Sequence, residues 1–462
     1  MERYKKYNGS GVEWFGEIPE GWEVKKLKYV ADARPSNIDK KNKDGEEAVL
    51  LCNYVDVYKN EFISSELAFM TATPSQEQKE KFLLQKGDVL ATKDSETPDD
   101  IAIPSLVVED FDNIVCGYHL THIKPKKIIG SYLFRYFQTK YLSSYFEVSA
   151  NGFTRYGLGV DKFGSALILN PPLEEQTAIA NYLDRKTAEI DSLIAQKQRL
   201  IELYQEEKIA IINQAVTKGM CVGVPLVGTL NNNGADQGNH KGLPLRDSGI
   251  DWLGEIPDWW EVKKLKYLVS KVGSGVTPKG GASVYLLSGV PLLRSQNIHF
   301  DELKMDDVAY ISEETHHSMA NSKVQAGDVL LNITGASIGR CFYADEHLGE
   351  ANVNQHVCII RPKNDVATRY LYFVLRSNLG QKQIDAEQTG SGREGLNFEA
   401  LNNFLIPHIS LEEQTAIVHH IETETARIDA KIAKTQRIIE LQKEYRTALI
   451  SEVVTGKIKV TS

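Results

Sequence analysis

Two segments of the chain carry apolar residues at the spacing of a long amphipathic helix. The first covers residues 173–218 and the second residues 411–453; neither contains glycine or proline. Apolar residues recur in both at intervals of three or four positions. The pattern predicts two helices of roughly 45 residues, each about 65–70 Å long at a rise of 1.5 Å per residue. Gly219 and Gly456 lie just past the last apolar positions, where helices commonly end.

The stretch before each predicted helix has a different pattern of apolar and polar residues. Short β-rich runs such as DVLAT, NIVCGYHLTHIKP and HVCIIRP alternate with loops, and shorter helical patterns lie among them. Each stretch is about as long as one ordinary domain. We therefore expect an α+β domain in front of each long helix.

The chain repeats itself at an offset of 238 residues. GEIPEGWEVKKLKYV at 16–30 returns as GEIPDWWEVKKLKYL at 254–268, and LEEQTAI at 173–179 returns at 411–417. His119 before KPK also matches His356 before RPK. The interior loops differ: after the shared GDVL, one copy reads ATKDSETPDDIAIPS and the other LNITGASIGRCFYAD. This indicates a duplicated domain with one frame and two sets of loops.

The repeat and the changes of pattern divide the chain into five segments. We expect a first α+β domain at 1–172, a helix at 173–220, a flexible linker at 221–245, a second α+β domain at 246–410 and a helix at 411–457. The linker prediction rests on a run rich in glycine and asparagine. Antiparallel pairing of the two helices within the chain is the economical arrangement, and a coiled coil between two copies is the alternative.

The composition limits the classes of function. A net charge of −9 and a pI near 5.8 are unusual for a protein that holds DNA by itself, because phosphate contacts require lysine and arginine. The five cysteines form no CxxC pair, and the opening MERYKKYNGS lacks an apolar signal region. No apolar run is long enough to span a bilayer. We expect a cytoplasmic protein with reduced thiols.

The order GEIPxxWEVKKL, GDVL, LEEQTAI, long helix and VT-Gly end, present twice, resembles the specificity subunit of type I restriction-modification systems. The resemblance covers nearly the whole chain outside the linker. It implies two target recognition domains separated by two long antiparallel helices. Each domain would read one half of a bipartite, asymmetric site in double-stranded DNA.

The resemblance also implies partners and cofactors. The helices would dock two methyltransferase subunits, with or without restriction and translocase subunits. S-adenosylmethionine, ATP and Mg are expected on those partners and no cofactor or metal on this chain, which would be non-catalytic. Partner subunits that hold the phosphates would also account for the acidic pI.

Direct readout of bases favours Arg or Lys for guanine and Asn or Gln for adenine, displayed on loops. In the first copy the candidates are Lys93, Ser95, Asn151, Thr154, Arg155 and Tyr156. In the second they are Thr277, Lys279, Arg294, Ser295, Gln296, Asn297, Thr334, Ser337, Arg340, Ser391 and Arg393. Candidates for the partner-binding and spacer helices are Leu173, Glu175, Gln176, Ile190, Ile201, Leu411, Glu413, Gln414, Ile428 and Ile439. The shared Trp22 and Trp260 are expected in the core or at a junction between domain and helix.

Two other classes of function remain as alternatives. A protein scaffold would use the twin domains to bind two copies of a partner without reading bases. An enzyme would need a catalytic constellation, and the candidates are weak. Asn170-Pro171-Pro172-Leu173 lacks the aromatic residue of an adenine methyltransferase motif, and the carboxylates around Pro257-Asp258 are too close along the chain for a nuclease core.

Overall fold

The computed structural model describes residues 2–41, 47–219, 244–250, 252–390 and 395–460. These fold into two compact units, of which unit 1 is Met1–Arg199 with Thr435–Ser462 and unit 2 is Leu200–Lys434. Each unit therefore contains one α+β domain and one half of each long helix. The predicted linker at 221–245 lies outside the described residues except for its last two positions.

Unit 1 is built on a five-stranded sheet in the order β4-β12-β8-β10-β6. The strands are β4 (Ala31–Pro35), β12 (Leu120–Pro125), β8 (Val89–Thr92), β10 (Pro104–Val107) and β6 (Phe62–Ile63). The central β8 is buried on both faces, because Val89 and Ala91 enter one apolar cluster and Leu90 enters another. Burial on both faces accounts for the continuous apolar run that follows Asp88 in the sequence.

Smaller elements complete unit 1. A second sheet has the order β11-β5-β7, from β11 (Ile114–Cys116), β5 (Val49–Cys52) and β7 (Met70–Ala72). The short helices are α1 (Tyr54–Lys59), α2 (Gln76–Phe82), α3 (Gly130–Phe137), α4 (Lys140–Ser149) and α5 (Val160–Ser165). Three two-stranded pairs join β1 (Tyr7–Gly9) to β2 (Glu17–Pro19), β3 (Glu23–Lys26) to β14 (Leu167–Asn170), and β9 (Asp94–Ser95) to β13 (Tyr156–Gly157).

Unit 2 repeats this plan with a four-stranded sheet in the order β18-β24-β21-β22. Its strands are β18 (Val269–Ser274), β24 (Val357–Pro362), β21 (Val329–Asn332) and β22 (Cys341–Tyr343). A second sheet joins β20 (Ala309–Ile311), β19 (Val290–Leu293) and β23 (Asn352–Val353). Two pairs join β15 (Leu245–Asp247) to β16 (Glu255–Pro257) and β17 (Glu261–Lys264) to β25 (Leu405–His408). The short helices are α7 (Leu265–Leu268), α8 (Glu313–Ser318), α9 (Thr368–Arg376), α10 (Asn378–Gly390) and α11 (Phe398–Asn402).

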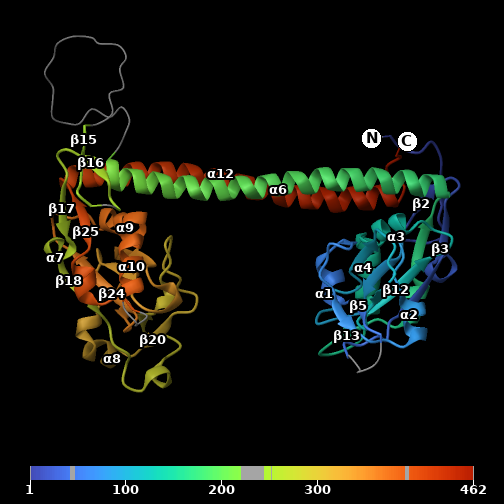
Figure 1. Cartoon of the computed structure of the whole chain (residues 1–462), viewed down its shortest axis with the longest axis horizontal. Coiled ribbons are helices and arrows are strands. Elements are labelled where there is room, and N and C mark those ends of the chain that lie inside the picture. The colour runs from blue at the N-terminus through green and yellow to red at the C-terminus, as the bar shows by residue number, and fades with distance from the viewer. Residues whose placement is uncertain (1, 42–46, 220–243, 251, 391–394, 461–462) are drawn as a thin grey trace, which may run out of the picture. The chain divides into compact units, whose positions relative to one another are not determined.

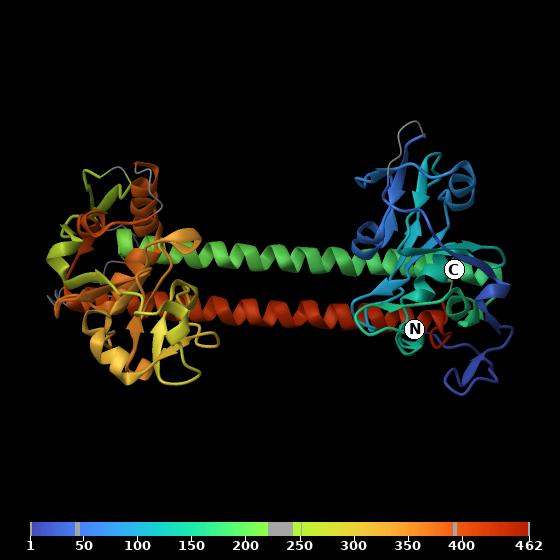
Figure 2. The ribbon, with the colours of Figure 1, turned by 90° about the horizontal axis from the view of Figure 1, so that it is seen from below.

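The two long helices, α6 (Leu173–Lys218) and α12 (Leu411–Val454), pair antiparallel within each unit (Figures 1 and 2). In unit 1, Arg446 Nε lies 2.9 Å from Asp191 Oδ1, and in unit 2, Lys208 Nζ lies 2.6 Å from Asp429 Oδ1. These two ion pairs occupy equivalent positions of the repeat. The prediction of two long helices that pair antiparallel is thus confirmed. α12 ends at Val454, just before Gly456, which has φ +74°.

The repeated tryptophan and the repeated LEEQ form the junction between domain and helix. Trp22 Nε1 donates to Glu175 Oε2 at 2.9 Å, and Trp260 Nε1 donates to Glu413 Oε1 at 3.0 Å. Both indoles are buried. The expectation that these tryptophans lie at a junction is confirmed.

The glutamine of each LEEQ links the start of its long helix to the start of a short one. Gln176 Oε1 accepts from Ile129 N at 2.8 Å, in front of α3, and Gln176 Nε2 donates to Pro171 O at 2.8 Å. Gln414 makes the matching bonds, accepting from Ala367 N at 2.7 Å and donating to Ile409 O at 2.9 Å. Both amides are buried, and a buried amide must be hydrogen-bonded. The glutamine is therefore present in both copies because it satisfies backbone groups at the helix starts.

Candidate nucleic-acid interface

Two loops that are far apart in the sequence meet in unit 1. β9 and β13 pair antiparallel, with Tyr156 opposite Ser95 and Gly157 opposite Asp94. The loop that leads into β13 closes on itself through two backbone hydrogen bonds between Asn151 and Gly157, of 3.1 and 2.9 Å. The predicted NGFTRYG and ATKDS segments therefore form one structure.

Asp94 organises this structure. Its Oδ1 accepts from Arg155 Nη2 at 2.5 Å, and its Oδ2 lies 2.8 Å from His119 Nδ1. The Asp94 side chain is 15% exposed, whereas that of Arg155 is 56% exposed. A mostly buried carboxylate thus holds a solvent-facing guanidinium.

A cavity of about 450 Å³ lies beside this pair. It is lined by Tyr54, Tyr58, Asp94, Ser95, Glu96, Thr97, Asp100, Thr154 and Arg155. The Tyr54 and Tyr58 rings stack with centroids 5.5 Å apart. Tyr58 donates to Asp100 Oδ2 at 2.8 Å, and this bond raises the pKa of the Tyr58 phenol. The cavity combines flat aromatic faces, carboxylates and one guanidinium.

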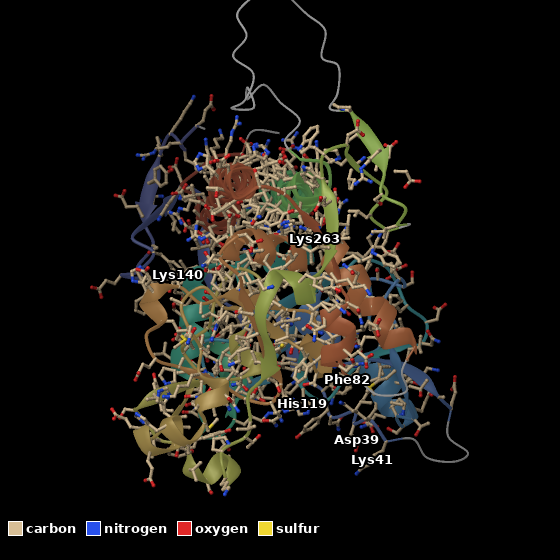
Figure 3. The ribbon with its side chains drawn as sticks, turned by 90° about the vertical axis from the view of Figure 1, so that its left-hand side faces the viewer. Asp39, Lys41, Phe82, His119, Lys140 and Lys263 are labelled. Atoms are coloured by element: carbon tan, nitrogen blue, oxygen red, sulfur yellow. The ribbon has the colours of Figure 1, made fainter. Side chains whose placement is uncertain are left out.

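Lys93 lies next to this cavity and is held within the protein. Its Nζ donates to Ser36 O at 3.2 Å and lies 4.2 Å from the centroid of the Tyr118 ring. Burial lowers the pKa of the Lys93 amine. Asp39, Tyr118 and His119 line a smaller neighbouring cavity, and Figure 3 labels Asp39 and His119 close together.

These residues lie at one end of the α+β domain of unit 1. In Figure 1, β13 marks the end of the domain that is away from α6 and α12. In Figure 3, His119 lies toward that same end. Within unit 1 the polar cavity is therefore separated from the helix-bound junction by the body of the domain.

A second polar cavity, of about 410 Å³, lies in unit 2. Its lining consists of Ser295, Gln296, Thr334, Gly335, Ala336, Ser337, Arg340 and His356. Asn332 Nδ2 joins the two loops by donating to Ser295 O at 2.8 Å and to Ser337 Oγ at 3.1 Å. The segments RSQN and TGASIGR, which lie apart in the sequence, are thereby brought together.

The remaining candidates are placed differently. Asn297 is buried and holds its own turn, accepting from Arg294 N at 2.9 Å and donating to Lys304 O at 2.8 Å. Arg294 donates to Asp307 O at 2.8 Å. Thr277 bonds to Gln355, and Lys279 is exposed. Ser391 and Arg393 lie outside the described residues.

A histidine is a shared feature of the two sites that was not among the predicted site residues. His119 contacts Asp94 in unit 1, and His356 Nδ1 lies 2.6 Å from Thr334 Oγ1 in unit 2. Both histidines stand just before the equivalent strands β12 and β24. The sequence indication of these site residues was that His119 and His356 occupy matching positions in the two copies of the repeat. The Tyr54 and Tyr58 pair had a weaker signal, two aromatic residues four positions apart on a short helix.

The candidate residues of the long helices divide by exposure. Ile190, Ile201, Ile428 and Ile439 are buried, whereas Leu173 and Leu411 are 57% and 46% exposed. Further exposed apolar side chains on these helices are Leu193, Leu203, Ile209, Leu441 and Tyr445. None of the described helices is both long enough and apolar enough to cross a bilayer. Within the described ranges, no three His, Cys, Asp or Glu side chains are grouped so as to hold a metal ion.

The chain is similar to known proteins over nearly its whole length. It is 22% identical over 468 residues to the MjaVIII type I restriction enzyme specificity subunit of Methanocaldococcus jannaschii, covering 100% of this chain and 98% of that protein. It is 28% identical over 264 residues to the EcoBI specificity subunit of Escherichia coli, covering 56% of this chain and 52% of that protein.

Solved structures show the same fold. The HsdS subunit from Thermoanaerobacter tengcongensis aligns with a TM-score of 0.51 at 16% identity, covering 96% of this chain and 98% of that one. A chain from a structural study of complex assembly and conformational transition of the type I R-M system aligns with a TM-score of 0.62 at 16% identity, covering 96% of this chain and 99% of that one.

A sequence model of the type I restriction modification DNA specificity domain matches residues 19–203 and again residues 257–442. The two matches follow the internal repeat and take in both α+β domains, with the larger part of each long helix. The chain therefore belongs to the type I restriction-modification specificity subunits, with two target recognition domains.

Proposed function

We propose that this chain reads a bipartite, asymmetric site in double-stranded DNA and presents it to two methyltransferase subunits. Each unit reads one half of the site with the polar cavity of its α+β domain. The methyltransferase subunits hold S-adenosylmethionine, and restriction and translocase subunits, where they join, hold ATP and Mg. This chain supplies recognition and no catalytic group, and it acts in the cytoplasm.

The observation that carries the proposal is a shared frame with two different cavities. The Trp–Glu and glutamine contacts of the junction are repeated bond for bond in the two units. Each cavity is lined by one arginine and by serine and threonine hydroxyls, but the other lining groups differ. Carboxylates and tyrosines complete the cavity in unit 1, and an amide and a histidine complete the one in unit 2. Different donor and acceptor sets on equal frames suit two different base sequences.

If the chain were instead a protein scaffold, the surfaces that bind the partner should be the same in the two units. A chain that binds two copies of one partner needs the same surface twice, and it has no use for two unlike polar cavities. The surfaces that do repeat lie at the junctions and on the long helices, where Leu173 and Leu411 are both exposed. We assign these helices to the two methyltransferase subunits, which are copies of one protein.

The deciding experiment compares adenine methylation in cells that express the cognate methyltransferase with and without this chain. Single-molecule sequencing of the genome should reveal a bipartite, asymmetric motif only when the chain is present. The methyltransferase must be shown to be active with another specificity subunit. If the active methyltransferase then methylates no new motif in the presence of this chain, the result favours a protein scaffold over a subunit that recognises DNA sequence.

The assignment of half-sites to units has its own test. Exchange of residues 20–170 for the corresponding domain of another such subunit should change one half of the motif and leave the other half intact. A change in both halves, or in neither, would contradict the division of labour between the two domains.

A further inference from the structure

Arg155 is presented to solvent in a fixed orientation. Its Nη2 donates to Asp94 and also lies 3.3 Å from His119 Nδ1. Within the part of the chain that the structure describes, Nε and Nη1 of this guanidinium have no hydrogen-bond partner. Asp94 Oδ1 takes one of the two N–H groups of Nη2. The second Nη2 N–H can donate in parallel with an N–H of Nη1 or Nε, so one bidentate edge of the guanidinium stays available to a ligand.

The anchor is itself rigid. Asp94 lies in β9, which pairs with β13 directly after Arg155, and its second oxygen is engaged by His119. An arginine that is already ordered loses less conformational entropy on binding than a free surface arginine. This arrangement favours recognition of a ligand with two acceptors side by side.

We propose that Arg155 reads the guanine of one G·C pair through O6 and N7 in the major groove, with Asp94 and His119 as its positioning residues. This assignment rests on the proposed function of the chain. It goes beyond that function by naming the base pair that Arg155 recognises, the two acceptor atoms and the half-site, which is the one read by unit 1. O6 and N7 of guanine are the paired acceptors that the major groove displays.

The surroundings of Arg155 argue against a phosphate contact. Three carboxylates, those of Asp94, Glu96 and Asp100, line the same cavity, and Arg155 is the one cation among the described lining residues. Carboxylates repel a phosphate group. They accept hydrogen bonds from amino groups, and the cytosine paired with that guanine displays an amino group in the same groove.

Lys93, which precedes Asp94 in the chain, does not add a second cation to this cavity. Lys93 Nζ is held by Ser36 O and by the Tyr118 ring, on the side of the smaller cavity. In unit 2 the cavity residues include Arg340 but no carboxylate. The proposed recognition of G·C by a buttressed arginine is therefore specific to one half-site.

The test uses the purified complex of this chain with its methyltransferase. Methylation rates are measured on a panel of duplexes in which each position of the half-site read by unit 1 carries all four base pairs. The variants are Arg155→Ala, Arg155→Lys and Asp94→Asn. Lys140→Ala, at an exposed residue of α4 in the same unit, is the control (Figure 3).

We expect both Arg155 variants to lower discrimination for guanine at one position by about tenfold or more, with the other positions unchanged. Lysine keeps the charge but lacks the planar fork that Asp94 orients. Asp94→Asn should relax the same position to a smaller degree, which a merely structural role would not confine to one base pair. Lys140→Ala should keep the full preference.

Three results would overturn the assignment. A uniform loss of methylation on all duplexes would mark Arg155 as a phosphate contact. An unchanged preference, or relaxation at an A·T position, would remove guanine as its ligand. If the wild-type complex shows no sequence preference at all while the methyltransferase is active with another specificity subunit, the proposed function itself fails, and the two failures are thereby distinguished.

Discussion

Trp22 and Glu175 are joined by a hydrogen bond of 2.9 Å between the indole nitrogen and the carboxylate, and Trp260 and Glu413 repeat it at 3.0 Å. Tyr4 adds a second hydrogen bond to Glu175 in unit 1. The bond fastens the first β-rich segment of each domain to the first turn of the long helix that follows. This one contact explains why both the GEIPxxWEVKKL segment and the LEEQTAI segment are repeated in the sequence.

Removal of this carboxylate should destabilise the protein. Glu175→Ala leaves a buried indole N–H without its acceptor, and we expect a loss of about 1–3 kcal/mol in the free energy of unfolding. Urea denaturation followed by tryptophan fluorescence measures the loss. Glu174→Ala, at the exposed neighbouring residue, is the control and should change little. Equal effects of the two substitutions would show that helix-terminal charge, rather than the bond, stabilises the junction.

A buried ion pair should contribute more than a surface one. Arg135 is 1% exposed and donates from Nε and Nη2 to Asp184 Oδ1 at 3.0 and 2.8 Å. Asp184→Ala leaves that guanidinium short of acceptors. We expect a loss of about 2–3 kcal/mol, below the range for a fully buried pair because Asp184 is partly exposed.

The control for Asp184→Ala is a surface pair on the same helix. Glu189 bonds to Lys186 at 2.6 Å, and both side chains are exposed by a third or more. Glu189→Ala should leave the melting temperature within experimental error, since such pairs contribute little. If both alanine variants melt alike, Arg135 finds other acceptors in unit 1.

His122 should make the stability depend on pH. It is buried and its Nε2 lies 2.6 Å from Asp88 Oδ2. Burial lowers the pKa of His122 below its ordinary value of 6.5, so protons bind preferentially to the unfolded chain. The stabilising contribution of the neutral ring is therefore complete above pH 6.5 and is lost as the pH falls through 6.5 toward the lower, folded-state value.

Thermal unfolding between pH 7.5 and 5.5 tests this sign. His122→Gln keeps a hydrogen-bond donor beside Asp88 without a titrating ring, so its melting temperature should fall less than that of the wild type over this range. Subtraction of the two curves removes the contribution of the other histidines. A wild type that gains stability relative to the variant on acidification would mean that the Asp88 carboxylate raises the pKa of His122 more than burial lowers it.

Gly152 should be required for recognition and dispensable for folding. A Cβ at this position would lie 2.0 Å from Arg155 O, so Gly152→Ala forces the loop that presents Arg155 to open. The residues around it are exposed, and unfolding should therefore be almost unaffected. We expect methylation specificity in one half-site to fall at an unchanged melting temperature.

Gly157→Ala is the matched control for that loop. Its Cβ would approach no closer than 3.9 Å, to Lys93 O, so the loop can keep its shape. Retained specificity in Gly157→Ala and lost specificity in Gly152→Ala would assign the effect to the loop. Loss in both would indicate general sensitivity of β13.

Periodicity and repetition could predict the frame because they are properties of contiguous sequence. The apolar spacing at 173–218 set the length of α6, and the matched Trp22 and Trp260 indicated the junction. Periodicity could not predict that each α+β domain forms one compact unit with part of both long helices. This grouping depends on contacts such as that between Asp191 and Arg446, which are 255 residues apart.

The candidate sites were predictable only in part for the same reason. Arg155 and Thr154 were identified by residue type, but Asp94, which holds Arg155, is a common surface residue until strand pairing places it there. Asn297 has the residue type of an adenine reader, yet its amide is consumed by its own turn. Residue type cannot distinguish an amide that faces solvent from one that satisfies the backbone.

The repeated glutamine has a consequence for how far the frame depends on the loops. In both units it binds the backbone of the frame, at Ile129 and Pro171 in one and at Ala367 and Ile409 in the other, and it does not touch the lining of either cavity. A substitution in a loop that lines a cavity therefore leaves the glutamine contacts in place, and the connection between domain and helix does not depend on which side chains the loops carry.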